Sequence, residues 1–493
     1  MNQYADWKAP ASDQTELIWP TPGQIAVDAR TNQQQLESAT IKIQNTPLPA
    51  LRKQMRTFIG HTSDQPLIAG GHQIELYHPG VWVKNVLLDA IARKHNVRPM
   101  HIAVDTDTPK HLQLRWPGGS VDISDDLLLK TGEWSGQVHV PTEGHFEKIE
   151  ERFTGASKAW NFQPTTGPFF EQFENLAGTR AALPEAILRS AMAVDASLGL
   201  KYDAQILSPM LAAPPYLALV HHIAADIEKF ASIYNAALAD YRRENKINSP
   251  TRPMPDLRVS DDSIELPFWF DNLATGDRSR AQVVKDNGRW HLLADAGEFP
   301  FDPSLPADVA AGRFGEFLNL HQLRLSPRAL TLTTFFRLLL VDNFVHGIGG
   351  GRYDQVTDQI LQRYWGIAAP KFAVTTATMV FPDAGQRSGV CVPCVKQELH
   401  HVAHNFLPKQ TYLAAITAAP RKSAERKRQY VAMHHTLQTA RPQSDAVNDL
   451  RRQLEQTIEQ KKREKVLFDR ELFFAIQPRE RLETMIAKYR ESV

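Results

Sequence analysis

The chain has few cysteines and no excess of charge of either sign. Only 2 of its 493 residues are cysteine, too few for a disulfide framework, so the sequence favours a reducing compartment and the cytoplasm. Its 56 Lys and Arg residues are balanced by 55 Asp and Glu residues, which makes a protein built around nucleic-acid binding unlikely. No basic segment followed by an apolar stretch begins the sequence, so we expect no secretory signal.

Long uninterrupted apolar runs are also missing. The most apolar stretch, residues 330–348, contains Arg337, Asp342, Asn343 and His346. A membrane-spanning helix tolerates such residues only when they have special partners, so we predict a buried core segment and no membrane association.

Residues 66–107 have the pattern of a βαβ unit. The run PLIAGG ends in two glycines, as expected of a buried strand, and Pro79 suits the first turn of a helix that extends to about residue 96. The segment MHIAVDTD then predicts a second strand that ends at Asp105 and Asp107. This order predicts parallel strands in an α/β sheet, whose ligands bind beyond the carboxyl ends of the strands.

The rest of the chain predicts both kinds of secondary structure. Residues 216–245 favour one or two long helices, and residues 256–298 favour a small β insertion. A second core unit is expected from Leu325, with a helix that Gly366 ends and a strand in KFAVTTATMVF. After residue 411, helical stretches flank a turn at Pro442 and Ser444, which predicts a helical hairpin or short coiled-coil arm.

The segment GGHQIELYHPGVWVKN is the most informative one. Glycines let a backbone approach an anion, a helix N-terminus presents N–H groups, and His72, His78 and Lys84 supply donors or positive charge. A tight turn with a capping histidine explains the same residues, and the chain has no P-loop motif. The candidate anion-binding residues here are Gly70, Gly71, Gln73 and Asn85.

A second glycine-rich segment begins at His346. Gly349, Gly350 and Gly351 precede a predicted helix and suit either another anion cradle or a structural turn. Asp354 stands where a dinucleotide fingerprint would need glycine, which argues against a nicotinamide cofactor. Candidate substrate-binding residues are His346, Arg352, which suits a carboxylate or phosphate, and Asp354.

Asp105 and Asp107 lie on one side of a strand end, because alternate residues share a face. They could hold Mg²⁺ or orient an amine or hydroxyl group, and Asx turns are the alternative. The run RKSAERKRQY, residues 421–430, favours a solvated helix face over a surface for an acidic partner or RNA.

The segment CVPCVKQELHHVAH offers ligand types that zinc accepts. Cys391, Cys394, His400 and His404 would form the site, with the two histidines on one helix face. Redox chemistry at Cys-x-x-Cys and metal-free core residues are the alternatives, and the spacing between the Cys pair and the His pair is short for a zinc finger.

Three blocks together resemble the bacillithiol-biosynthesis cysteine-adding enzyme family. They are GGHQIELYHPGVWVKN, which carries Gly80 and Lys84, then HIAVDTD, and then the stretch from Ser326-Pro327 to Ile348-Gly349-Gly350. The sequences VDTDT and Arg352-Tyr353-Asp354 depart from the family's pattern.

The resemblance implies a fold as well. It implies a Rossmann-like parallel sheet core, related to class I aminoacyl-tRNA synthetases and nucleotidyltransferases, and a C-terminal coiled-coil arm that forms a homodimer. The expected units are the first part of the core, a helical connecting region with the β insertion, the second part of the core, the helical arm and a terminal helix, at residues 1–210, 211–300, 301–410, 411–470 and 471–493.

The resemblance also implies an activity. The enzyme would be a ligase that forms a carbon–nitrogen bond between an amino acid, by resemblance cysteine, and the amino group of a small acceptor such as glucosaminyl malate. ATP or a related nucleotide would activate the carboxylate. His72, His78 and Lys84 would neutralise charge, while Asp105 or Asp107 would position or deprotonate the amine. The alternatives are a nucleotidyltransferase, another amide ligase and a non-catalytic dimeric scaffold.

Overall fold

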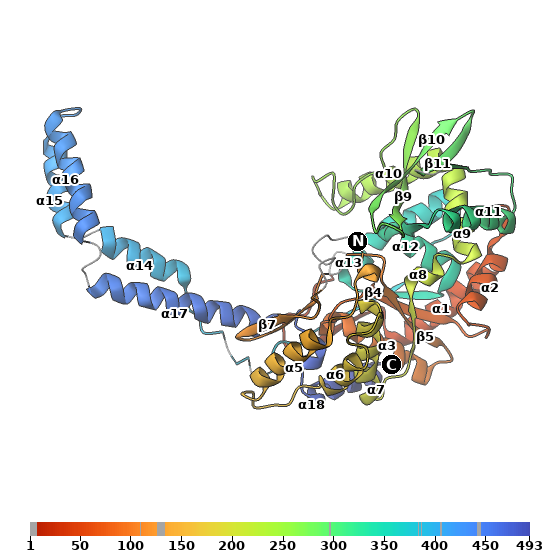
Figure 1. Cartoon of the computed structure of the whole chain (residues 1–493), viewed down its shortest axis with the longest axis horizontal. Helices are drawn as coiled ribbons and strands as arrows, with labels where there is room; N and C mark the ends of the chain where they lie inside the picture. The colour runs from red at the N-terminus through yellow and green to blue at the C-terminus, as the bar shows by residue number, and fades with distance from the viewer. Residues whose placement is uncertain are drawn as a thin grey trace. The chain divides into compact units, whose positions relative to one another are not determined.

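The computed structural model describes residues 7–108, 110–125, 134–294, 297–382, 384–385, 387–404, 407–440 and 445–493, except for the side chains of residues 403, 404, 407, 408 and 440. The chain forms two compact units (Figure 1). The larger unit comprises Met1–Arg115, Ser120–Met379 and Arg470–Val493, and the smaller comprises Trp116–Gly119 and Val380–Asp469.

A six-stranded mixed sheet lies at the centre of the larger unit. Its strand order is β1-β15-β14-β4-β5-β8, and all neighbours are parallel except β1 and β15. The mostly parallel pairing confirms the α/β prediction. The strands are Thr15–Trp19 (β1), Leu67–Gln73 (β4), Arg98–Val104 (β5), Asp203–Ile206 (β8), Asn343–His346 (β14) and Ala373–Thr378 (β15).

The predicted strand, helix and strand of residues 66–107 are β4, α3 (Pro79–Lys94) and β5. Helix α3 packs on β4, β5 and β15, and the C-terminal helix α18 (Arg479–Ser492) packs on α3. Every residue of α3 from Pro79 to Ile91 is buried. The helix therefore has no solvent face, and each of its polar side chains needs a partner inside the protein.

Asp342 joins the starts of β4 and β14. Its Oδ1 accepts hydrogen bonds from Arg52 at 2.7 Å and Arg56 at 2.5 Å, and its Oδ2 accepts one from the Leu67 N–H at 2.7 Å. Both arginines lie on α2 (Leu48–Phe58). Burial lowers the pKa of Arg52 to about 10, although Asp342 opposes the shift. These contacts fix the two strands side by side, which sets where their carboxyl ends meet.

A second sheet of five antiparallel strands forms the predicted β insertion. Its order is β12-β11-β10-β9-β13. The strands are Ser263–Asn272 (β9), Arg278–Asp286 (β10), Arg289–Ala294 (β11), Gly297–Pro300 (β12) and Leu323–Pro327 (β13).

The insertion extends further along the chain than the sequence predicted. Ser326 and Pro327 pair with β9, so they end the antiparallel sheet and do not begin the second part of the core. Asp271 of β9 explains this, because its Oδ2 accepts hydrogen bonds from Arg324 and from the Ser326 hydroxyl. The prediction of a core unit from Leu325 was therefore wrong.

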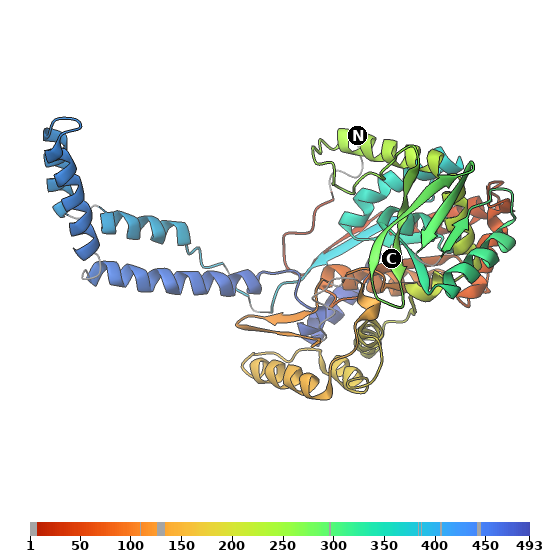
Figure 2. The same cartoon turned by 45° about the horizontal axis from the view of Figure 1, so that its top comes forward.

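Helices pack against both sheets, and the five-stranded sheet keeps an open face (Figure 2). Of the one or two helices predicted for residues 216–245, the structure has two. The helices of the larger unit not yet given are Pro22–Glu37 (α1), Glu143–Ser157 (α5), Gly167–Glu174 (α6), Leu183–Ser197 (α7), Leu207–Met210 (α8), Pro214–Ala225 (α9), Ile227–Glu244 (α10) and Ala307–Leu320 (α11). Short paired strands lie at Lys42–Ile43 (β2) and Thr46–Pro47 (β3).

The apolar stretch 330–348 is buried, as predicted. It forms α12 (Ala329–Phe335), a π-helical turn at Phe336–Leu340 and strand β14. Helix α13 (Ile348–Ile360) follows, and Gly366 ends a second π-helical turn in the left-handed conformation, which confirms its predicted capping role. Among the described residues, no helix combines the length and apolar character needed to cross a membrane.

The smaller unit is largely helical. It contains α14 (Val392–His404), α15 (Leu407–Ala418), α16 (Ala424–Ala440) and α17 (Asp445–Leu467). Helix α14 packs on α17, and α15 packs on α16 around Ile416, Met433 and Leu437. The predicted hairpin between the helices that flank residues 442–444 was therefore wrong, because α16 and α17 each pack on a different helix in the described part of the chain. Pro442 and Ser444 themselves lie outside the described residues.

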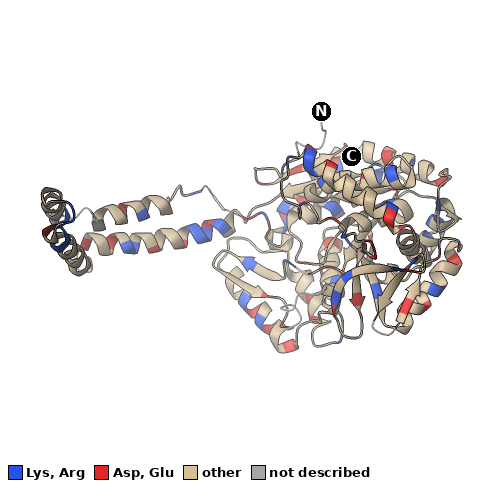
Figure 3. Cartoon of the chain, turned by 90° about the horizontal axis from the view of Figure 1, so that it is seen from above, with Lys and Arg blue, Asp and Glu red and all other residues tan. Residues whose placement is uncertain are grey.

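Strands β6 (Gln113–Trp116) and β7 (Gly119–Asp122) form a short hairpin. Acidic and basic residues both lie along α14 and α17 (Figure 3). In the basic run, Arg428 forms an exposed ion pair with Glu425, as the predicted solvated helix face would.

Candidate functional site

A cavity of about 630 Å³ lies at the carboxyl ends of β4 and β14 in the larger unit. His72 and Gly349, from the two glycine-rich segments, both line it. The two strands are neighbours in the sheet, so the segments that follow them meet at one edge. The cavity volume is within the range of small-molecule sites. Eight of the predicted site residues line it: Gly71, His72, His78, Lys84, His346, Gly349, Gly350 and Arg352.

Lys84 approaches the cavity from the first turns of α3. Its Nζ donates a hydrogen bond of 2.8 Å to the Gly71 carbonyl oxygen. Burial lowers the pKa of Lys84 to about 8, although the Glu75 carboxylate raises it. About half of the Lys84 side chains are therefore protonated near pH 8, and an anion in the cavity would favour the charged form.

His72 forms a pair with Glu75, a residue that the sequence analysis did not single out. The His72 Nε2 lies 2.8 Å from Glu75 Oε1. Burial, together with the positive charge of Lys84, lowers the pKa of His72 well below its usual value. Burial also raises the pKa of Glu75. His72 is therefore a neutral hydrogen-bonding group at this wall and not a source of fixed positive charge.

The N-terminus of α3 is capped by His78. The Gly80 N–H donates to His78 Nδ1 at 3.1 Å, and the Val81 and Trp82 N–H groups donate to the His78 carbonyl oxygen. Burial lowers the pKa of His78, so Nδ1 is free to accept. The predicted capping histidine is therefore present, and these N–H groups are already used. Anion binding by the other residues of the segment stays a prediction.

Gly80 allows the first turn of α3 to lie close to two other side chains. A Cβ at this position would lie 2.5 Å from Arg470 Nη2 and 2.6 Å from Thr376 Oγ1. The Arg470 guanidinium donates to Thr376 Oγ1 at 2.9 Å and also lines the cavity. The sequence analysis missed Arg470 because it lies far along the chain from either glycine-rich segment.

The N-terminus of α13 differs, because its N-cap residue is Gly347 and no side chain caps it. The first turn contains Gly349 and Gly350, both at the cavity wall. A Cβ at Gly349 would meet no atom within 4 Å, so this turn is open. An open helix N-terminus presents N–H groups and a partial positive charge to an anion.

Cations outnumber acids at the described cavity wall. Lys8, Lys84, Arg352 and Arg470 line it, against the single acid Glu471. The Arg352 Nη2 donates to the Trp7 carbonyl oxygen, which holds the guanidinium at the edge of the cavity. The wall as a whole therefore favours an anionic or phosphate-bearing molecule.

Several predicted site residues do not line the cavity. Asp105 lies in the loop after β5, where its Oδ1 accepts a hydrogen bond of 2.9 Å from the Ser208 N–H and burial raises its pKa. Asp107 accepts a hydrogen bond from Gln73 Nε2. These three side chains join segments that are far apart in the chain, so the contacts are not the Asx turns of the alternative interpretation, and the side chains do not line the cavity.

Gly70, Gly351 and Asp354 also lie away from the cavity. A Cβ at Gly70 would make ordinary contacts with Lys84 and Leu88, whereas a Cβ at Gly351 would lie 2.5 Å from Val374 Cγ2, so close packing requires glycine only at position 351. Asp354 is buried beneath the cavity wall, where it pairs with Arg337 and His346. It cannot contact a substrate directly.

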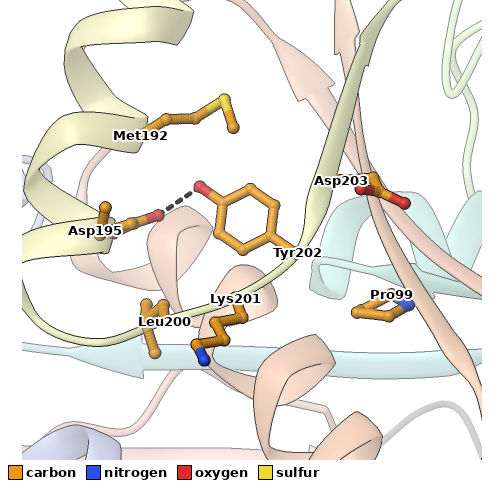
Figure 4. A pocket seen from close by; sticks show the side chains of 8 residues that line it. Pro99, Met192, Asp195, Leu200, Lys201, Tyr202 and Asp203 are labelled. Atoms are coloured by element: carbon orange, nitrogen blue, oxygen red, sulfur yellow. Dashed lines mark hydrogen bonds between the residues drawn. The ribbon is translucent and has the colours of Figure 1, made fainter.

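Asn85 belongs to a polar network on another face of α3. Its Nδ2 donates to Asp195 Oδ2 at 3.2 Å, and its Oδ1 accepts from His101 Nδ1 at 2.8 Å. The Tyr202 hydroxyl donates a hydrogen bond to Asp195 Oδ2, and both residues line a second cavity of about 450 Å³ (Figure 4). Burial raises the pKa of Asp195 to about 6. Asn85 is therefore satisfied inside the protein and does not face the anion cavity.

The predicted zinc site is a disulfide in the structure. The sulfur atoms of Cys391 and Cys394 are bonded to each other at the start of α14. A disulfide sulfur is not a thiolate, so zinc binding would first need reduction of this bond. His400 lies on the same helix, and the His404 side chain lies outside the described residues. No group of three metal-ligating side chains gathers among the described residues.

No protein-family model matches the chain, and no curated protein matches it significantly.

Proposed function

We propose that the chain is a ligase that forms an amide bond between an amino acid and the amino group of a small acceptor, with a nucleotide bound in the cavity. By resemblance, the amino acid is cysteine, the acceptor is of the glucosaminyl malate type, and the chain is a distant member of the bacillithiol-biosynthesis cysteine-adding enzymes. The observation that carries the proposal is the single cavity bordered by both glycine-rich segments.

The residues at the cavity fit a phosphate-bearing molecule. A Cβ at Gly71 would lie 3.0 Å from Phe344 Cζ, which is a tight contact, and the Gly71 carbonyl oxygen accepts the hydrogen bond from Lys84 Nζ. The open N-terminus of α13, Lys84 and Arg352 would hold the phosphates, while His72 and His78 would donate or accept hydrogen bonds. A nucleotide would supply the leaving group that a free carboxylate lacks in water.

Electrostatic stabilisation by the protein would lower the barrier to bond formation. Each well-placed donor at the wall would contribute about 3 kcal/mol. Arg352 would hold the carboxylate of a substrate through its planar guanidinium group. Asp105 and Asp107 no longer have the proposed role of deprotonating the amine, because both are engaged in loop contacts away from the wall.

The resemblance supplies the finer parts of the proposal. The six-stranded sheet would be a Rossmann-like core, and the helices α14–α17 would be the arm through which two copies form a dimer. The enzyme would work in the cytoplasm on small molecules. Zinc could bind the Cys391 and Cys394 thiolates after reduction, and metal analysis of the reduced chain would test this.

Calorimetric titration tests nucleotide binding. ATP and ADP should bind the wild-type chain, and Lys84→Met should weaken binding about tenfold or more while it keeps the buried volume. The matched control is Lys158→Met, a lysine at the end of α5 that does not line the cavity. Absence of heat with ATP, ADP and cysteine, each at millimolar concentration, would contradict the ligase proposal.

Product analysis separates the ligase from other activities. ATP, cysteine and an amino-sugar acceptor are incubated with the chain, and mass spectrometry detects the amide while a coupled assay detects released phosphate or pyrophosphate. Amide formation that Lys84→Met reduces supports the ligase. Nucleotide transfer without an amide would instead indicate a nucleotidyltransferase.

A further inference from the structure

His346 has an arrangement that its predicted substrate-binding role does not explain. It is the last residue of β14, its ring is 5 % exposed, and it lines the cavity. Its Nε2 lies 3.0 Å from Asp354 Oδ2. The rings of Phe344 and Phe372 pack against the imidazole in T-shaped contacts, with ring centroids 4.7 Å and 5.3 Å away, which restrains its orientation.

Asp354 is fixed in turn by a buried arginine. Arg337 Nη1 donates to the same Asp354 Oδ2 at 2.6 Å, and Arg337 Nη2 donates to Asp358 at 2.6 Å. Arg337 is 2 % exposed and Asp354 is 1 % exposed. Although burial opposes it, the positive charge of Arg337 and the hydrogen bond from His346 hold the pKa of Asp354 well below its usual range. Asp354 is therefore a carboxylate that can only accept hydrogen bonds.

This geometry determines which imidazole nitrogen carries the proton. Because the Asp354 carboxylate only accepts, His346 Nε2 must donate, so Nδ1 of the neutral ring has the lone pair. A Cβ at Gly350 would lie 2.8 Å from Nδ1, which places this nitrogen beside the open first turn of α13. Gly350 lines the cavity, whereas Asp354 does not. No described residue hydrogen-bonds to Nδ1.

We infer that His346 is the proton acceptor for the attacking amine in the cavity, and that Asp354 and Arg337 are positioning residues that orient it. The inference rests on the proposed function. The amine nitrogen forms the new bond to the carboxyl carbon, and the phosphate-bearing leaving group departs with the carbon–oxygen electron pair. The proton lost by the amine nitrogen goes to His346 Nδ1. Asp354 stabilises the imidazolium that results.

The wild-type tautomer can be measured without any substrate. Nitrogen-15 labelled histidine in the full chain gives imidazole spectra, and the His346→Gln chain assigns the His346 signals by their loss. The expected spectrum shows a protonated Nε2 and an unprotonated Nδ1. The opposite tautomer would overturn the inference. The variant serves only to assign the signals, and the tautomer itself is read from the wild-type chain.

Amide formation then tests the chemistry. His346→Gln should lower turnover about 100-fold or more and change nucleotide affinity by about twofold or less, since the ring moves a proton and does not hold the phosphates. The matched control is His435→Gln, an exposed histidine of α16, which should keep full turnover. A His346→Gln chain with turnover within about threefold of wild type would overturn the inference and leave the ligase standing. A wild-type chain that forms no amide would overturn both.

Asp354→Asn tests the positioning role. The amide can accept or donate, so the Nε2 tautomer should no longer be enforced, and the His346 spectrum should show both tautomers. Asp358→Asn is the matched control, because Asp358 contacts Arg337 and does not contact His346. An unchanged tautomer in a folded Asp354→Asn chain would overturn the assignment of Asp354.

Discussion

Two strand-and-helix pairs, β4 with α3 and β14 with α13, lie side by side and end at the same cavity. In the first, the His78 side chain accepts the Gly80 N–H and caps the helix. In the second, Gly347 occupies the N-cap position and leaves the helix start open. The two helix N-termini therefore differ in their ability to bind an anion. Of the two helices, only α13 presents an open first turn to a ligand.

The glycines at the starts of α3 and α13 also differ in their surroundings. Gly80 is needed because Arg470 and Thr376 approach the backbone closely. Gly347 and Gly349 have open space where a Cβ would lie. A glycine-rich segment in a sequence can thus indicate tight packing or an accessible backbone, and only the surroundings distinguish the two.

The largest effect is expected where the two pairs share an anchor. Asp342→Ala leaves Arg52 and Arg56 buried without their carboxylate partner, so the free energy of unfolding should fall by about 3–5 kcal/mol. Urea denaturation measures this change. Asp13→Asn, which breaks an exposed pair with Arg481, should cost below about 1 kcal/mol. Similar losses in the two variants would show that Asp342 is not an anchor.

The two glycines should respond differently to the same substitution. Gly80→Ala forces Arg470 and Thr376 to move, so the free energy of unfolding should fall by about 1–3 kcal/mol. Gly349→Ala should leave it unchanged or raise it slightly, since alanine favours a helix more than glycine does. Thermal unfolding of both variants tests the contrast, and equal melting temperatures would refute it.

The cap of α3 should depend on pH. His78→Ala should cost about 1 kcal/mol at pH 8, whereas His78→Asn should keep the cap through its side-chain oxygen. Burial lowers the pKa of His78 well below 6.5, so the unfolded chain binds the proton first as the pH falls. The contribution of His78 to the free energy of unfolding therefore decreases as the pH falls below 6.5. The free energy of unfolding of wild type should exceed that of His78→Ala by less at pH 5.5 than at pH 8. A difference that does not change with pH would contradict the cap.

The substitution with the smallest expected effect on stability, Gly347→Ser, should have the clearest effect on anion binding. Gly347→Ser gives α13 a side-chain cap, which changes the free energy of unfolding by only a few tenths of a kcal/mol. Its hydroxyl would occupy the N–H groups of the first turn, so calorimetry should show weaker binding of pyrophosphate and ATP. Gly347→Ala adds a Cβ without a cap and should bind as wild type does. Equal affinities for all three chains would show that the open helix start does not hold the anion.

Local sequence patterns predicted the elements around the cavity well. An apolar run before Gly70 gave strand β4, and Pro79 with apolar residues at helical spacing gave α3. Gly366 ended its helix as predicted. These features depend on neighbours a few residues away, so the sequence carries them directly.

The direction of polar side chains was harder to predict. Because α3 is buried on all sides, Lys84 faces the cavity while the adjacent Asn85 faces Asp195, and helical spacing alone does not distinguish a ligand-facing side chain from one with an internal partner. Asp354, proposed as a substrate contact, lies behind His346 because Arg337 reaches it from the π-helical turn after α12. Arg337 was noticed only as a residue that interrupts an apolar run.

The sequence by itself determined part of the local structure: strands β4 and β5, the start of α3 at Pro79, and the helix end at Gly366. It placed Gly349, Gly350 and Gly351 before a helix, whereas α13 begins at Ile348 and contains them. The tertiary structure alone decided that His72 and Gly349 face one cavity, and that the first turn of α13 stays open while that of α3 is capped. The physical reason is that strand pairing places β14 beside β4, and the partners of each N–H group and side chain come from segments far away in the chain.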